Sequence, residues 1–184
     1  MDAFEQLVSE ILWMEGLWVR TSVKVEITKE EKRLIGRPSS PRWEIDIVAY
    51  SGRDNLLYAV ECKSYLDSRG VRLCGFDGTD ANTAERYKLF CDDPLREAVF
   101  SRLKAQFAAS GACPPDARVQ LCLACGRIAS DKDRQGLRDH FAAKGWLLWD
   151  ELWLREKLKK MSDQGYENQV SAVVAKLLLR GKAE

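Results

Sequence analysis

The stretch that decides the fold is residues 43–65, WEIDIVAYSGRDNLLYAVECKSY. Its first eight and last ten residues are rich in β-branched and aromatic side chains, and the turn-forming letters SGRDN stand between them. Two such runs joined by turn residues predict a β-hairpin. If the turn is centred between Arg53 and Asp54, Asp46 lies directly opposite Glu61, with Cβ atoms ~5 Å apart.

Strand alternation assigns the charged and the apolar side chains of this hairpin to opposite faces. Asp46, Glu61 and Lys63 are expected on one face, and the other face is apolar, with Ile45, Ile47, Val60 and Cys62. Two carboxylates in contact repel each other, and a hard divalent cation such as Mg²⁺ relieves that repulsion. The alternative is a cross-strand surface salt bridge between Lys63 and one of the carboxylates.

The segments around the hairpin predict an α/β domain. Before the hairpin we expect a helix at 4–15, a strand at 18–28 with its odd-numbered apolar residues on one face, and a polar loop at 29–42. After it we expect a loop at 66–82, a helix at 83–110 broken near Pro94, a strand at 119–128, a helix at 133–144, a strand at 146–149, and helices at 151–160 and 168–180. A parallel crossover through 83–110 gives a mixed central sheet flanked by helices in three layers.

Composition limits the classes of protein that remain. The 184 residues are 46% hydrophobic and 31% charged, as in one globular domain. Lysine and arginine number 29 against 28 acidic residues, so any attraction to nucleic acid must be local. Without a long apolar segment or a basic leader, the chain is expected to be cytoplasmic and not to contact a membrane. Its six cysteines are expected to be free thiols.

An Asp followed by a hairpin and then Glu-x-Lys, with a helix before it and an α-β unit after it, resembles the PD-(D/E)XK nuclease superfamily. The resemblance covers about residues 1–150, includes the Mrr-like and Holliday-junction-resolvase-like branches, and implies a restriction-endonuclease-like fold. It departs from the superfamily pattern at Ile45, which stands where the name-giving proline would stand.

The resemblance also implies the roles of individual residues. Asp46, Glu61 and the main chain of Cys62 would bind Mg²⁺, for which Mn²⁺ would substitute, and Lys63 would help to activate water. Many members add a glutamate from the first helix. Here that residue is Glu5, with Glu10 as a second candidate.

Contacts to nucleic acid are expected from a basic segment beside the hairpin. Residues 20–42 hold seven lysines and arginines against three glutamates. Arg33, Arg37 and Arg42 would follow a phosphate backbone, and Trp43 would stack on a base. The alternative for each residue of this segment is a solvated loop. Arg86 and Lys88, at the start of the helix expected at 83–110, are expected to provide a second phosphate contact.

The sequence therefore predicts a Mg²⁺-dependent endonuclease that hydrolyses DNA in defence or repair. The rival hypothesis is a catalytically silent module with the same fold that binds nucleic acid or a protein partner. Residues 1–150 would form the nuclease-like core and 151–184 a helical extension. That extension would either pack on the core or form the contact of a homodimer.

Overall fold

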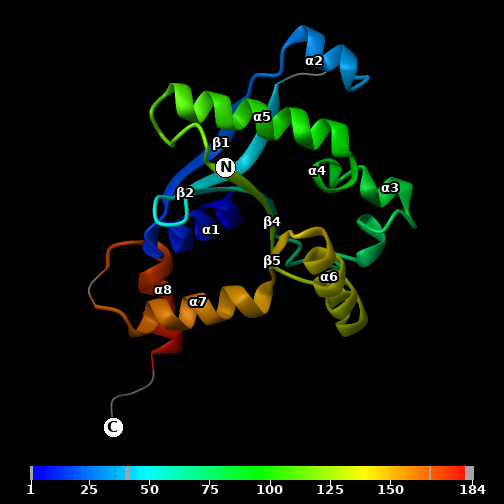
Figure 1. Cartoon of the computed structure of the whole chain (residues 1–184). Coiled ribbons are helices and arrows are strands. Elements are labelled where there is room, and N and C mark those ends of the chain that lie inside the picture. Colours follow the sequence, from blue (N-terminus) through cyan, green and yellow to red (C-terminus); the bar gives the residue numbers. More distant parts are fainter. Residues whose placement is uncertain (1, 40–41, 166, 181–184) are drawn as a thin grey trace.

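The computed structural model describes residues 2–39, 42–165 and 167–180, and its centre is a five-stranded sheet with the order β1-β2-β3-β4-β5 (Figure 1). Strands β1 to β3 are antiparallel, whereas β3, β4 and β5 are parallel, so the sheet is mixed. The expectation of an α/β domain with a mixed sheet is confirmed. The strands are β1 (Trp18–Val25), β2 (Trp43–Ser51), β3 (Leu56–Lys63), β4 (Arg118–Cys125) and β5 (Leu147–Trp149).

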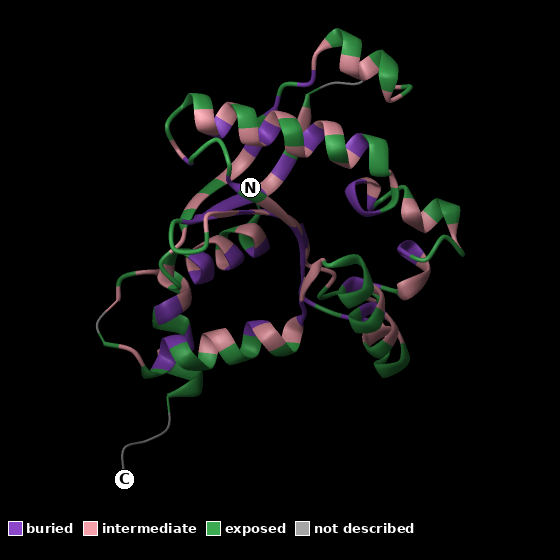
Figure 2. Cartoon of the chain, viewed as in Figure 1, coloured by how far each residue is buried: buried purple, intermediate pink, exposed green. Residues whose placement is uncertain are grey.

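Helices cover both faces of the sheet, an arrangement compatible with a three-layer fold (Figure 1). One apolar cluster joins the sheet to α1, α7 and α8, and the other joins it to α4, α5 and α6. Buried side chains accordingly follow the strands and the inner sides of these helices (Figure 2). The helices are α1 (Ala3–Met14), α2 (Lys29–Leu34), η1 (Leu73–Gly75), α3 (Ala81–Ala84), α4 (Lys88–Cys91), α5 (Asp93–Ala109), α6 (Asp131–Lys144), α7 (Glu151–Asp163) and α8 (Val170–Leu179).

The hairpin has the predicted register over its paired length, from Ser51 opposite Leu56 to Ile47 opposite Val60. Beyond Ile47 the two strands part. Strand β2 stays paired with β1 as far as Trp43, and β3 stays paired with β4 as far as Lys63. A fork therefore opens between β2 and β3 at the point where the sequence places its carboxylates.

Strand β1 does not keep one apolar face, as the alternation predicted. Val19 packs in the cluster of α1, whereas Val23 and Val25 lie in the cluster of α5. The change occurs at Ser22, whose φ of 51° is left-handed and interrupts the two-residue period of the strand. Ile45 and Ile47 of β2 likewise lie in different clusters, so the expected common face of these two residues is wrong.

The loop expected at 29–42 contains a helix, α2. The local signal is a capping box, in which the Thr28 hydroxyl accepts from the Glu31 N–H and the Glu31 carboxylate accepts from the Thr28 N–H. Every residue of α2 is at least partly exposed, so hydrophobic periodicity could not reveal it. The Glu31 carboxylate also accepts from Arg102 of α5 at 2.7 Å.

The single helix expected at 83–110 is three helices, α3, α4 and α5. One interruption falls at Asp92, next to the expected break at Pro94, because the Asp92 side chain caps α5 and Pro94 stands in its first turn. The other separates α3 from α4 at Glu85–Tyr87, a break for which the sequence has no glycine or proline.

Candidate active site in the fork between two strands

Asp46 lies in the fork. The ladder ends one pair short of Asp46 and Glu61, and the Asp46 carboxylate instead accepts a hydrogen bond from the main-chain N–H of Cys62 at 2.7 Å. This bond replaces the ladder contact that the regular register would have made there. The fork therefore holds one carboxylate in a fixed position against the middle residue of Glu61-Cys62-Lys63.

Glu61 provides the second carboxylate, and its environment is unusual for a charged group. Its side chain is only 14% exposed, and its Oε1 atom is buried and finds no hydrogen-bond partner in the described part of the chain. Oε2 lies 3.7 Å from the ammonium of Lys63. A buried carboxylate oxygen without a partner is costly, and a cation or a hydrogen-bond donor would relieve that cost.

The pKa of Glu61 reflects this environment. Burial is the largest cause of its rise from 4.5 to about 7, and the negative charge of Asp46 adds to it, while Lys63 acts in the opposite direction. Burial also raises the pKa of the Cys62 thiol, with Asp46 and Glu5 contributing, so this thiol stays protonated. The repulsion expected between Asp46 and Glu61 is therefore present in the folded protein.

The two candidate glutamates of α1 have separate roles. The Glu5 carboxylate accepts from the Asp2 N–H at 3.1 Å in a capping box, and its charge contributes to the raised pKa values of Glu61 and Cys62. Glu5 is thus close enough to the fork to act on it electrostatically. Glu10 instead accepts from the N–H and hydroxyl of Ser171, which ties α1 to α8.

A cavity of about 300 Å³ borders Glu61 and brings together most of the residues expected to bind nucleic acid. Its walls include Arg37, Arg42, Trp43, Arg86 and Lys88. Arg33 does not line this cavity and lies exposed on α2. Segments that are far apart in the sequence thus bring four cations to the cavity beside Glu61.

Acidic partners of these cations were not predicted from the sequence. Arg37 pairs with Asp92 at 2.8 Å, and Arg42 pairs with Glu26 at 3.1 Å. Lys88 pairs at 3.0 Å with Glu85, which also lines the cavity. The three-residue spacing of the last pair is a signal that could have identified Glu85, whereas the first pair links segments that meet only in the fold.

The oxygen donors that the fork could offer to a metal are the carboxylates of Asp46 and Glu61. Across residues 2–39, 42–165 and 167–180 there is no cluster of three or more histidine, cysteine, aspartate or glutamate side chains that could hold a metal. Two carboxylates are what Mg²⁺ commonly takes from a protein, with water and phosphate oxygens completing its coordination. The unpartnered Oε1 of Glu61 is the atom here that most needs such a ligand.

Comparisons of the chain with protein-family models, with curated proteins and with solved structures found no match. The site must therefore be interpreted from its own geometry. None of the helices in the described ranges is both long enough and apolar enough to cross a membrane.

All six cysteines, at positions 62, 74, 91, 113, 122 and 125, are free thiols, as predicted.

Proposed function

We propose that this protein is a Mg²⁺-dependent endonuclease that hydrolyses phosphodiester bonds of DNA and belongs to the PD-(D/E)XK superfamily. The observation that carries the proposal is the buried, unpartnered Oε1 of Glu61 at the edge of a cavity lined with arginine and lysine. A structural salt bridge with Lys63 would use only Oε2 and would leave Oε1 unexplained.

The carboxylates of Asp46 and Glu61 and the main-chain carbonyl of Cys62 would hold the metal, and Mn²⁺ would substitute because it accepts the same oxygen ligands. A bound metal of this kind lowers the pKa of a coordinated water and neutralises charge on the scissile phosphate. The hydrogen bond from the Cys62 N–H keeps the Asp46 carboxylate in the fork, so this ligand is positioned before any cation arrives.

Lys63 would be the catalytic residue beside the metal. Its ammonium lies 3.7 Å from the Glu61 carboxylate on the same side of β3, and its side chain is 23% exposed, so it is partly shielded from water. A lysine there can orient the attacking water and stabilise the charge that develops on the phosphate. Glu5, from α1, would increase the negative potential that attracts the cation.

The cavity cations supply the contact to the substrate. Arg37, Arg42, Arg86 and Lys88 would bind phosphate oxygens, and Trp43 would stack on a base. These contacts would position the backbone without reading its sequence. Arg33, exposed on the neighbouring α2, would extend the same track. Free thiols suit a reducing compartment, and we propose the cytoplasm, where the protein would act in defence or repair.

The deciding experiment is incubation of purified protein with supercoiled plasmid, branched DNA and single-stranded DNA, with Mg²⁺, Mn²⁺ or EDTA. We expect cleavage with either metal and none with EDTA. The matched variant is Asp46→Asn, which keeps the shape of the side chain and should bind DNA without cutting it. Binding without cleavage by the wild-type protein on every substrate would contradict the proposal and favour the silent binding module.

A further inference from the structure

Helix α8 buries its small apolar residues and exposes its large ones. Ala172 and Ala175 are buried against the core, whereas the larger residues face solvent. Leu177 and Leu178 are 79% and 77% exposed. A surface helix of a globular protein normally buries its large aliphatic face. We call five of the exposed residues of this helix the α8 stripe: Val170, Val173, Val174, Leu177 and Leu178.

The α8 stripe is one continuous surface because its residues recur at intervals of three and four along the helix. It exposes roughly 500 Å² of apolar area, within the range of the largest patch on a typical monomer, and such patches mark interaction sites. Within Val170–Leu179 the one charged residue is Lys176, whose ammonium donates to the Gly165 carbonyl. The stripe therefore offers no charge to a nucleic acid and requires an apolar partner.

A hollow of about 470 Å³ lies beside the N-terminal end of α8. Its walls come from α1, β1 and Gln169, and they include Trp13, which is 54% exposed. The Oε1 atom of Gln169 is buried and lacks a hydrogen-bond partner among the residues that the structure describes. The hollow also holds one charge of each sign, from Arg20 and from Glu10, whose carboxylate accepts from Gln6 and Ser171. One end of α8 thus has a depression with one unpartnered acceptor, Gln169 Oε1, and the other end has two protruding leucines.

We propose that the α8 stripe binds a second copy of this chain in an antiparallel, two-fold arrangement. Such a symmetric contact requires a surface that is complementary to itself. With α8 antiparallel to its copy, Leu177 and Leu178 of each copy reach the hollow beside Trp13 of the other. Ten helical residues span about 15 Å, so the protruding leucines and the hollow are separated by one helix length on each copy.

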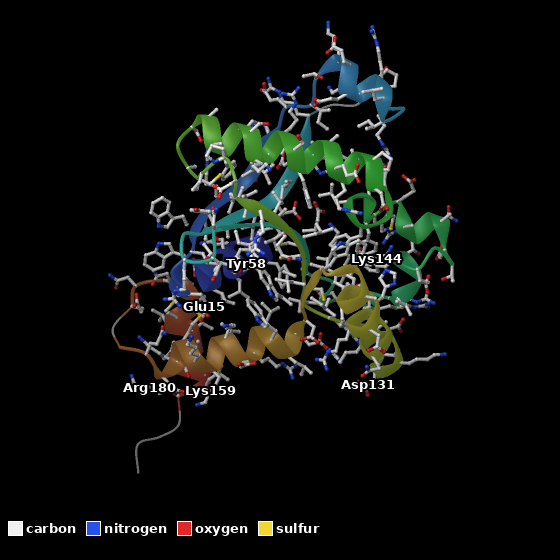
Figure 3. All side chains as sticks on the ribbon, in the orientation of Figure 1. Glu15, Tyr58, Asp131, Lys144, Lys159 and Arg180 are labelled. Carbon is white, nitrogen blue, oxygen red and sulfur yellow. The ribbon has the colours of Figure 1, made fainter. Side chains whose placement is uncertain are left out.

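Charge complementarity supports a second copy over other apolar partners. Arg180 lies at the C-terminal end of α8 (Figure 3). In the antiparallel pair it approaches the Glu10 carboxylate of the other copy, for which the described residues show no ion pair. The contact would bury the stripe and Trp13 on both copies, together about 1,200 Å², the lower limit of a specific interface. The dimer is therefore expected to dissociate on dilution.

This contact is independent of the proposed nuclease activity, because α8 and the cavity beside Glu61 share no lining residue. Figure 1 also shows α8 at the opposite end of the molecule from α2. A dimer through α8 would leave both cavities accessible. It would also present two sites in a fixed two-fold relation.

The first test is sedimentation velocity of the full chain from about 1 to 100 µM. We expect the wild type to shift with concentration from 20.9 kDa toward twice that mass. Leu177→Glu should remain monomeric, because burying a charge at the centre of an apolar contact is costly. The matched control is Leu34→Glu, the same change at an 85% exposed leucine on α2, and it should associate like the wild type. Circular dichroism should show that both variants are folded.

The second test addresses the antiparallel geometry. Val174 lies near the middle of α8 and would meet its own copy at the two-fold axis. Val174→Cys should therefore form an intermolecular disulfide when oxidised glutathione is added, in a background where the exposed Cys91 is replaced by serine. Leu34→Cys in the same background controls for cross-linking through other thiols and should not form the dimer.

Three results would overturn the proposal. The first is a wild-type protein that stays monomeric at 100 µM. The second is association that survives Leu177→Glu, which would place the contact elsewhere. The third is a monomer that binds phosphatidylcholine–phosphatidylglycerol vesicles through Leu177 and Leu178, which would assign the α8 stripe to a lipid surface. None of these results depends on whether the protein cleaves DNA.

Discussion

Replacing Glu61 by glutamine should stabilise the metal-free protein at neutral and alkaline pH. The reason is that the folded state holds the Glu61 carboxyl at a pKa of about 7, against 4.5 for the ordinary group, chiefly because of burial. Between these two values the folded state binds more protons than the unfolded state, so the free energy of unfolding falls as pH rises. Glutamine has nearly the same shape and no charge, and therefore removes this dependence.

The magnitude follows from the size of the shift. A change from 4.5 to about 7 at 1.36 kcal/mol per unit is a cost of about 3 kcal/mol, fully present above pH 7 and absent below pH 4.5. Mg²⁺ should offset this loss of unfolding free energy in the wild type, because a ligand present at one hundred times its dissociation constant stabilises a protein by about 2.7 kcal/mol. Glu61→Gln should show little of this gain.

The assay is urea denaturation of both proteins at pH 4.5 to 8, in EDTA and in Mg²⁺. The control is Glu15→Gln, because Glu15 has the opposite shift. Burial raises its pKa, but hydrogen bonds from Lys157 and Lys160 outweigh burial and keep the pKa below 4.5. This control should lose stability at neutral pH. The reasoning would be refuted if the free energies of unfolding of the wild type and Glu61→Gln differed by an amount that does not change with pH. The metal site would be refuted if Mg²⁺ stabilised Glu61→Gln as much as it stabilises the wild type.

Three further predictions concern chemistry, substrate binding and the fold. Lys63→Met should fold, and it should bind Mg²⁺ and DNA within a few-fold of the wild type. Its plasmid nicking should slow by ~10² or more. Nicking at the wild-type rate would exclude the assigned role of Lys63. Arg42→Ala should reduce the slope of log affinity against log salt on duplex DNA by about 0.9, measured by fluorescence anisotropy, and an unaltered slope would exclude a phosphate contact. Asp150→Ala should destabilise the fold by about 3 kcal/mol at pH 7, because it removes the buried carboxylate that pairs with Arg134 and Arg138 and that caps α7, and leaves Glu151 to hold Arg134. Burial opposes ionisation of Asp150, but hydrogen bonds from Trp153 and Arg134 keep its pKa below 3.8. The loss of stability in the variant should therefore disappear in melting curves as the pH falls below 3.8 and through the pKa of the folded state. A loss of stability that does not depend on pH would argue against this explanation.

The sequence by itself determined the features that depend on neighbouring residues. The hairpin register follows from the turn between Arg53 and Asp54, because a tight turn sets which residues face each other across the strands. Helix α6 ends at Gly145, whose φ of 68° is the left-handed cap expected of a glycine after a helical pattern. The assignment of Glu61 and Lys63 to the face opposite Val60 and Cys62 is likewise local.

The fork was not predictable from the strands that form it. Beyond Ile47, β2 parts from β3 but stays paired with its other neighbour, β1, and that choice between partners is not written in the hairpin itself. The sequence placed Asp46 opposite Glu61, and only the fold showed that Asp46 instead binds the Cys62 N–H. Helix α2 was missed because its polar surface has no hydrophobic period, although its capping box was visible at Thr28 and Glu31.

The surroundings of the site and the orientation of α8 were decided by tertiary structure alone. Arg37 and Arg86 line one cavity although 48 positions lie between them, and their meeting depends on how α2, α3 and α4 pack around the sheet. In α8 the sequence shows an apolar helix, but both its alanines and its leucines satisfy a hydrophobic pattern. The core accepted the small face of Ala172 and Ala175, and Leu177 was left outside, because close packing selects side chains by the space available as well as by polarity.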